Sequence, residues 1–344
     1  MTTSWLPRTI DWRGDHAVLI DQTLLPNELV LLEVRDVDTM IDAIKRLAVR
    51  GAPAIGVAGA LGVAIASLAA KRDGHSAEWV RAEADRIGVA RPTAVNLVWA
   101  VTAMKLVIDE GCDAVVRAAT ELLEDDVVTQ SRLGQFGADL VNELCATAIA
   151  ANGGVRIHTH CNAGGLACVE WGTALGIVRA LHERGLVLEV FADETRPLLQ
   201  GARLTAYELG AMGIAHRVLV DGAGPSAIRL GLVDCVIIGA DRIAANGDTA
   251  NKIGSYPLAL AAARAGIPFV VAAPESTVDA STPNGDAIHI EERSADEVHE
   301  FGGVRVTPAG SGAWNPAFDI TPADLITAII TDRRVVRPAM GDTL

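Results

Sequence analysis

Several residue types that define common protein classes are scarce in this chain of 344 residues. Phe, Trp and Tyr make up only 4% of the sequence. The apolar half is mostly Ala, Val, Leu and Ile, which is typical of packed helices and buried parallel strands rather than of an aromatic-rich β-sandwich. Basic residues are also outnumbered, since 29 Lys and Arg against 43 Asp and Glu give a formal net charge of −14. We therefore expect no nucleic-acid partner, because such binding depends on Lys and Arg that neutralise phosphates.

Cysteine is infrequent and follows no regular spacing. The five cysteines are Cys112, Cys145, Cys161, Cys168 and Cys235. An odd number without a spacing pattern does not predict a disulfide framework, so a reducing, cytoplasmic location is the simpler expectation. The first fifteen residues, MTTSWLPRTIDWRGD, contain no apolar segment after a basic start. We accordingly expect no cleaved signal peptide.

Charge is absent from residues 52–70, APAIGVAGALGVAIASLAA. This segment is long enough to cross a bilayer. It is nevertheless built from Ala and Gly more than from Leu and Phe, so its transfer into lipid is only weakly favourable. Gly56, Gly59 and Gly62 instead suggest a helix on which other backbones pack closely. We expect a buried helix and no membrane partner.

The length of the chain suggests two domains. The first 35 or so residues alternate between polar and apolar side chains, which predicts short strands with a turn at Pro26-Asn27. Helical spacing of apolar residues follows from about residue 38 to about residue 150, and Asn152-Gly153-Gly154 is typical of a helix end. We predict an N-terminal small-sheet and helical domain over residues 1–150 and a second domain over residues 151–344.

The second half alternates apolar strands with helical stretches. The predicted strands are VRIHTH, LVLEVFAD, HRVLVD, CVIIGAD and PFVVAAP. Strands and helices in this order predict an α/β fold with a Rossmann-like, doubly wound, mostly parallel sheet. In such sheets ligands bind beyond the carboxyl ends of the strands. Candidate functional residues at those ends are Cys161, Asp193, Glu194, Asp221 and Asp241.

Two of these residues carry chemistry that suits a catalytic site. A cysteine such as Cys161, in a Gly-rich turn before a helix, can have a lowered pKa. An aspartate such as Asp241, at the end of an apolar strand, can have a raised pKa and act as a general acid. The structural alternative stays open at this point: Cys161 as a small buried apolar residue, and Asp241 as a capping residue.

The sequence HTHC at 158–161 raises the possibility of a metal site, because two histidines two apart on a strand share one face. No HExxH or CxxC motif supplies further ligands. We therefore expect histidines that are packed and hydrogen-bonded, and no metal.

A dinucleotide site is suggested by GAGPSA at 222–227, which fits G-x-G-x-x-A and is followed by Asp241. The helix after this motif spans only about two turns, which is short for a crossover helix, and the motif does not follow the first strand of the sheet. On its own it is a weak signal.

Anion binding has a better candidate at Arg50-Gly51-Ala52-Pro53, directly before the uncharged helix. Backbone donors at a helix N-terminus, together with the Arg50 guanidinium, are sufficient to bind a phosphate. Arg91-Pro92-Thr93 repeats the arrangement, and Lys252, after Asn251, offers a further cation. Taken singly, each of these arginines is as easily explained by a surface ion pair.

Taken together, these motifs resemble the methylthioribose-1-phosphate isomerases, within the larger family of translation initiation factor 2B α/β/δ-like proteins. The segments that carry the resemblance are AVRGAPAIGVAGA, RPTAVNLVWA, HTHCNAGGLA, ADETRPLLQGARLTAYEL, VIIGADRIAANGDTANKIGSYPLA, PFVVAAPESTVD, IEER and NPAFDITP. They lie in order from about residue 48 to 330, and the longest of them are specific.

The resemblance implies a homodimer that interconverts 5-methylthioribose 1-phosphate and 5-methylthioribulose 1-phosphate in methionine salvage. The implied partner is a small phosphorylated sugar, and no cofactor is expected, so that GAGPSA becomes a structural loop. By the matching motifs, Cys161 corresponds to the catalytic cysteine and Asp241 to the proton donor. The positions that match substrate-binding residues are Arg50, Gly51, Ala52, Arg91, Gln200, Asn251 and Lys252.

Two departures from the family pattern bear on the substituent at C5 of the sugar. GAGPSA replaces the stretch usual after HRVLVD, and Gln130 stands where an asparagine is expected. If these residues line the pocket, the substrate can differ. The alternatives are an isomerase of 5-deoxyribose 1-phosphate or ribose 1,5-bisphosphate, and a non-catalytic regulatory subunit like the initiation factor 2B relatives.

Overall fold

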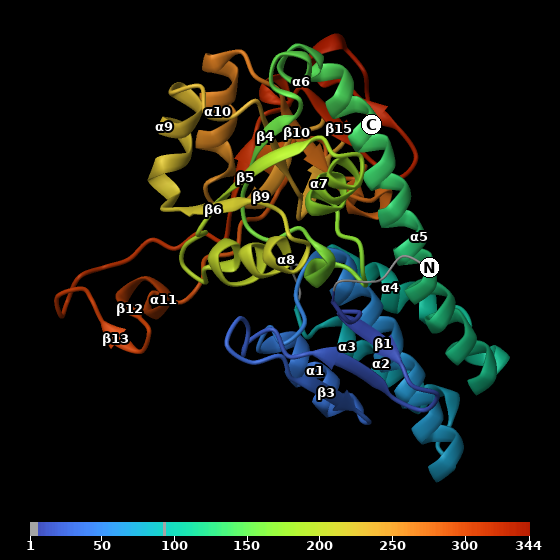
Figure 1. Cartoon of the computed structure of the whole chain (residues 1–344). Helices are drawn as coiled ribbons and strands as arrows, with labels where there is room; N and C mark the ends of the chain where they lie inside the picture. Colours follow the sequence, from blue (N-terminus) through green and yellow to red (C-terminus); the bar gives the residue numbers. More distant parts are fainter. Residues whose placement is uncertain (1–5, 92–93) are drawn as a thin grey trace.

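The chain begins with a three-stranded antiparallel sheet that packs on a group of helices, as Figure 1 shows. The computed structural model describes residues 6–91 and 94–344. The strands are β1 (Ile10–Trp12), β2 (Ala17–Ile20) and β3 (Leu31–Val34), and the helices are α1 (Val37–Lys45), α2 (Ala52–Asp73), α3 (Ala77–Gly88) and α4 (Val95–Lys105). The alternation in the first 35 residues and the helical spacing after it therefore predicted these elements correctly.

Helix α2 is the uncharged segment, and it lies at the centre of the N-terminal core. It is the one helix among the described residues that is long and apolar enough to cross a membrane, but 78% of its most apolar window is buried inside the molecule. Its glycines allow close packing, since a Cβ on Gly56 would lie 3.1 Å from the carbonyl oxygen of Asn96 in α4. The buried helix expected from the Ala and Gly content is the structure observed.

Helix α5 (Cys112–Leu144) runs from the first half of the chain to the second, and it packs on α2 at one end and on α7 at the other. It is followed by α6 (Ala146–Asn152), which ends at Gly153 in the left-handed region with φ 78°. The predicted domain boundary after residue 150 falls within α6 and stays a prediction. The sequence pattern indicated helices here, but not a single helix that joins the two halves.

The second half contains a seven-stranded sheet in the order β16-β15-β10-β7-β4-β5-β6. Its strands are β4 (Val155–Thr159), β5 (Val187–Asp193), β6 (His216–Leu219), β7 (Cys235–Ile238), β10 (Phe269–Ala272), β15 (Ala328–Ile330) and β16 (Val335–Val336). All neighbours are parallel except β15 and β16. Helices α5 and α7 (Ala174–Glu183) cover one face, and α9 (Gly224–Arg229) and α10 (Ser255–Ala265) cover the other. The predicted doubly wound α/β sheet is confirmed.

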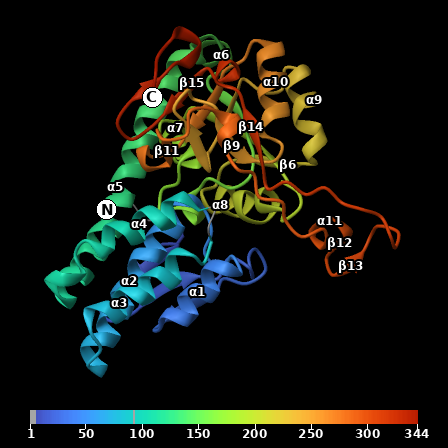
Figure 2. The ribbon, with the colours of Figure 1, turned by 180° about the vertical axis from the view of Figure 1, so that it is seen from behind.

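A second, four-stranded sheet was not predicted. It has the order β11-β8-β9-β14, with β11 (Val278–Asp279), β8 (Arg242–Ala244), β9 (Thr249–Lys252) and β14 (Phe318–Thr321). Beyond it, α11 (Asp296–His299), β12 (Glu300–Phe301) and β13 (Val304–Arg305) form an arm that projects from the molecule (Figure 2). The second sheet matters for function because β9 carries two of the predicted substrate-binding residues.

Two helices of the second half are irregular at their N-terminal ends. Helix α7 begins only at Ala174, because residues 163–173 form a loop closed by an antiparallel bridge between Gly164 and Gly172. Helix α8 (Ala206–Ala211) is preceded by a π-helical turn, η3 (Gly201–Thr205). Both deviations lie next to the predicted site.

Candidate active site

A cavity of about 260 Å³ lies between the N-terminal helices and the carboxyl ends of the large sheet. Seven of the nine predicted site residues line it: Arg50, Gly51, Arg91, Cys161, Gln200, Asp241 and Lys252. The other two, Ala52 and Asn251, line a smaller adjoining cavity that Cys161 and Asp241 also border. The structure thus brings together residues that are up to about two hundred positions apart in the chain, because they all meet where the two halves face each other.

The backbone of Cys161 is held in an unusual conformation. Its φ of 61° lies in the left-handed region, which residues other than glycine seldom adopt. The Cys161 N–H donates to Thr195 Oγ1 at 2.9 Å, and Thr205 Oγ1 donates to the Cys161 carbonyl at 2.6 Å. Backbone strain of this kind persists only where the surroundings fix it, and it gathers at functional sites. The two threonine hydroxyls therefore set the position of the thiol.

Arg50 enters the cavity from the N-terminus of α2. The residue after it, Gly51, has a φ of 89°, and a Cβ there would lie 2.5 Å from Ala167, so only glycine fits. The Arg50 guanidinium donates to the side-chain and main-chain oxygens of Asn162, and Asn162 Nδ2 donates to Glu208 Oε1 at 2.7 Å. Burial raises the pKa of Glu208 to about 6, although the hydrogen bond from Asn162 and the backbone N–H groups of the loop oppose the rise.

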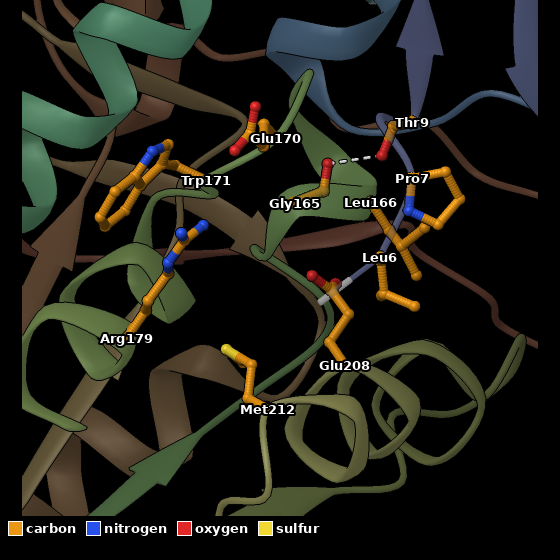
Figure 3. Close-up of a pocket in the computed structure, with 10 residues that line it drawn as sticks. All are labelled: Leu6, Pro7, Thr9, Gly165, Leu166, Glu170, Trp171, Arg179, Glu208 and Met212. Atoms are coloured by element: carbon orange, nitrogen blue, oxygen red, sulfur yellow. Dashed lines mark hydrogen bonds between the residues drawn. The ribbon is translucent and has the colours of Figure 1, made fainter. Parts of the chain in front are cut away.

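The far side of this network is shown in Figure 3, where Glu208 points toward Gly165 and Leu166. Thr9 Oγ1 donates to the Gly165 carbonyl at 2.7 Å, so the start of the chain also fixes this loop. The cavity here has a volume of about 30 Å³. That is room for roughly one water molecule and not for a sugar.

Six basic side chains line the larger cavity: Arg46, Arg50, Arg91, Arg203, Lys252 and Arg293. Lys252 Nζ donates to the carbonyl of Ala317 at 3.0 Å and lies 4.6 Å from the centre of the Phe318 ring. Burial lowers the pKa of Lys252 and of Arg91, so both charges are costly to keep there. Because Arg50 and Lys252 donate to an amide and to carbonyl oxygens in these contacts, their charges are not neutralised there. A bound anion would neutralise them.

Cys161 and Asp241 both keep their protons to higher pH than usual. Burial raises the pKa of the Cys161 thiol, and the positive charges of Arg50 and Lys252 only partly oppose it. Burial likewise raises the pKa of Asp241, against Lys252, Arg50 and Arg91. The cavity therefore holds a thiol and a carboxyl group as two potential proton donors beside an anion-binding surface.

Two other acids at the strand ends, Asp193 and Asp221, do not line these cavities. Asp193 is 1% exposed and lies 3.1 Å from His158 Nε2 and 2.8 Å from His160 Nδ1. Asp221 accepts the backbone N–H groups of Thr195 and Arg196, each at 2.7 Å. The carboxylates of these two strand-end candidates therefore hold the structure and do not line the cavities of the site.

The grouping of His160, Asp193 and Asp221 does not suit a metal ion, although their potential ligand atoms all lie within 4.8 Å of one another. Both ring nitrogens of His160 already face oxygen atoms at 2.8 Å, and Asp221 accepts two backbone N–H groups. No lone pair on that ring is directed at a common centre.

The residues that departed from the family pattern do not line the 260 Å³ cavity. Gln130 borders a separate cavity beside α4 and α5. Gly224, in GAGPSA, packs closely, since a Cβ there would lie within 3.0 Å of Leu258, His158 and Asp193. This motif therefore serves packing in the structure, and α9 after it has only six residues.

Sequence reasoning missed several residues of the site. Arg203 and Arg293 also line the cavity, and Asn162, Thr195, Thr205 and Glu208 orient the residues that do. Most of them lie in motifs already singled out, such as HTHCNAGGLA and ETRPLLQGARLTAYEL. The motifs therefore identified the segments that form the site, but they did not show which residues of distant segments contact one another.

Comparison with known proteins places these features in context. Residues 48–338 match the Initiation factor 2 subunit family. The chain is 48% identical to the methylthioribose-1-phosphate isomerase of Alkalilimnicola ehrlichii, over 96% of this chain and 94% of that protein. It is 52% identical to a probable bifunctional methylthioribose-1-phosphate isomerase/methylthioribulose-1-phosphate dehydratase of Nocardia farcinica, over 95% of this chain but only 59% of that protein.

Two solved structures are similar over nearly the whole chain. One is the 5-methylthioribose 1-phosphate isomerase of Pyrococcus horikoshii OT3, with a TM-score of 0.86, 40% identity, and coverage of 97% of this chain and 93% of that one. The other is the translation initiation factor eIF-2B, subunit delta, of A. fulgidus, with a TM-score of 0.84, 39% identity, and coverage of 98% and 97%.

Proposed function

The chain belongs to the Initiation factor 2 subunit family, and from this premise we propose that it is an isomerase that converts 5-methylthio-α-D-ribose 1-phosphate to 5-methylthio-D-ribulose 1-phosphate in methionine salvage. The observation that carries the proposal is the meeting of Cys161 and Asp241 in one cavity beside basic residues. A protein that only binds a partner has no need of a buried thiol and a partly buried carboxyl group that face the same space.

The chemistry of the substrate explains this pair. Its phosphate is on the anomeric oxygen, so the sugar has no free aldehyde and the ring must open before hydrogen can move from C2 to C1. Opening requires a proton on the ring oxygen, and Asp241, whose pKa is raised by burial, is suited to donate it. Cys161 then assists the hydrogen transfer, either as a proton shuttle through an enolate or by stabilising a hydride transfer.

The phosphate binds at the N-terminus of α2. Gly51 and Ala52 supply backbone N–H groups at the start of a helix of 22 residues, and Arg50 and Lys252 add positive charge. Such a terminus favours an anion through its donors and its dipole. Fixing the phosphate there also disfavours its elimination from an open-chain intermediate.

The substituent at C5 is proposed to be methylthio. Four apolar side chains line the same cavity: Leu47, Leu198, Leu204 and Phe318. An apolar wall suits a thioether better than a second phosphate. The proposal also includes a homodimer, a cytoplasmic location and no requirement for a cofactor, as the family resemblance implies.

The experiment is to incubate the purified protein with 5-methylthioribose 1-phosphate and to follow the ketose signal by NMR. We expect turnover in the wild type and a loss of several orders of magnitude in Asp241→Asn, with the exposed Asp125→Asn as the matched control. Absence of turnover in the folded wild type would support the regulatory-subunit alternative. Faster turnover of 5-deoxyribose 1-phosphate or ribose 1,5-bisphosphate than of the methylthio sugar would instead select one of the alternative substrates.

A further inference from the structure

His160 has oxygen atoms at both ends of its ring. Its side chain is fully buried, with Nδ1 2.8 Å from Asp193 Oδ2 and Nε2 2.8 Å from the carbonyl oxygen of Ile253. A carbonyl oxygen only accepts hydrogen bonds, and an ionised carboxylate does the same. A neutral imidazole has one N–H and would leave one of these two contacts without a proton.

The charged groups around the ring favour the cation. Asp193, which also contacts His158, faces it from the large sheet, Asp221 from the segment after β6, and Asp319 from β14. All three of the groups that face it are carboxyl groups. Burial by itself lowers the pKa of His160, but the hydrogen bond and negative charge of Asp193, the Ile253 carbonyl and the charge of Asp221 together raise it.

The ring also joins three separate elements of the site. His160 precedes Cys161, and Ile253 follows Lys252, so one side chain ties the catalytic thiol to the substrate-binding lysine. The ring lies directly on the backbone of Gly254, where a Cβ would come within 2.7 Å of Cε1. A chain of hydrogen bonds also links Asp193 to Cys161. The Thr195 hydroxyl donates to the main-chain carbonyl of Asp193, and it accepts a hydrogen bond from the Cys161 N–H.

We propose that His160 is a positioning residue that stays doubly protonated at neutral pH, and that its imidazolium fixes Cys161 and Lys252 relative to each other. The assignment of roles to Cys161 and Lys252 rests on the proposed isomerase function, whereas the protonation state of His160 does not. His160 does not line the 260 Å³ cavity but borders the smaller adjoining one, of about 30 Å³. Both of its ring nitrogens already face protein oxygens, so it acts through its neighbours.

The direct test is NMR of the full-length protein labelled with ¹⁵N-histidine. Because Cε1 of His160 lies against Gly254, its signals are identified by the through-space contact to the Gly254 α protons, without any variant. We expect two protonated ring nitrogens from about pH 6 to about pH 8, where an ordinary histidine loses its charge. A single neutral tautomer near neutral pH would overturn the proposal.

Kinetics of His160→Gln provide the second readout. A glutamine amide cannot donate at both ends, so the thiol and the lysine lose their fixed spacing while Arg50 still binds the phosphate. We expect kcat to fall by about 100-fold with a much smaller change in KM, because small misplacements cost this much in rate. The matched control is His289→Gln, at an exposed histidine.

The outcomes separate the two proposals. A His160→Gln variant that keeps the kcat of His289→Gln would overturn the positioning role, as would a loss confined to KM. A wild type that does not isomerise the sugar would overturn the proposed function instead, and the ¹⁵N signals would still decide the protonation state of His160. If His160→Gln does not fold, the wild-type NMR experiment remains sufficient to refute the doubly protonated ring.

Discussion

Glu208 orients Arg50 without touching it, because the side chain of Asn162 stands between them. Asn162 Nδ2 donates to Glu208 Oε1 at 2.7 Å, which leaves Asn162 Oδ1 free to accept from the Arg50 guanidinium. The amide cannot turn over without losing both contacts. Glu208 is 5% exposed, so its carboxylate depends on the donors around it. The direction of the Arg50 charge in the cavity is therefore set from a separate helix.

Glu208→Gln is expected to raise KM for the sugar phosphate by about tenfold, with a smaller effect on kcat. The carboxylate of Glu208 has two acceptor oxygens, whereas the glutamine amide has one oxygen and one NH2 group. The NH2 group would face a donor, either Asn162 Nδ2 or the N–H groups of the loop, so the network loses an acceptor. Steady-state kinetics beside the exposed control Glu28→Gln provide the measurement. An unchanged KM in a folded Glu208→Gln enzyme would show that Asn162 holds Arg50 unaided.

The same carboxyl group makes stability depend on pH. Burial raises the pKa of Glu208 from 4.5 to about 6, so the folded state binds a proton at a pH where the unfolded state does not. The contribution is fully present below about pH 4.5 and is lost as the pH rises through about 6, and it amounts to about 2 kcal/mol. We expect the difference in unfolding free energy between wild type and Glu208→Gln, measured with urea, to shift in favour of the wild type as the pH falls through this range. A difference that is constant with pH contradicts the assignment.

The sequence predicted that the candidate residues would lie close together because of the geometry of parallel sheets. Cys161 and Asp241 follow apolar strands, β4 and β7, and neighbouring parallel strands end at the same edge. Charge and helix position likewise indicated Arg50 at the start of α2. These inferences need only local patterns, and the structure brings all three residues to one cavity.

The parts that could not be predicted depend on contacts between distant segments. The sequence did not show that Asp193 would lie away from the cavity, because its partners are the side chains of His158 and His160, on the neighbouring strand and just after it. The second sheet was missed because β8 and β9 are strands of three and four residues without a regular apolar alternation. Arg203 was missed because its partners lie about 180 positions earlier in the chain.

Thr205 tests how the thiol is held. Its Oγ1 donates to the carbonyl of Cys161 at 2.6 Å and accepts a longer bond, of 3.3 Å, from Asn162 Nδ2. Thr205→Val replaces this hydroxyl by a methyl group of similar size. The carbonyl would lose its partner, and the left-handed backbone of Cys161 would relax. We expect kcat to fall by about 10- to 100-fold in Thr205→Val and to be largely retained in Thr205→Ser, which keeps the hydroxyl. Equal activity of the two variants would remove the hydroxyl from the explanation.

Arg203 closes the cavity from the side of η3. Its guanidinium donates to the carbonyl oxygens of Gln22 at 2.8 Å and of Leu25 at 2.9 Å, and a further bond reaches Leu198. Gln22 lines the cavity, so this one side chain fastens part of the N-terminal wall to the second half of the chain. The acceptors are neutral, and burial lowers the pKa of Arg203. Its charge therefore adds to the positive surface that a phosphorylated sugar would meet.

Two substitutions distinguish the hydrogen bonds that Arg203 donates to main-chain carbonyls from its positive charge. Arg203→Met is expected to lower the free energy of unfolding by about 2 kcal/mol and to raise KM. Buried carbonyl groups lose their donors, and the N-terminal segment that includes Gln22 is held less firmly against the second half of the chain. Arg203→Lys keeps the charge, but a single ammonium group cannot reach carbonyls in the fork geometry of a guanidinium. We expect the lysine variant to resemble the methionine variant in urea unfolding and in KM, with the exposed Arg217→Lys on β6 as control. If Arg203→Lys has the KM of the wild type, the charge of Arg203 and not its hydrogen bonds to the carbonyl groups determines substrate binding.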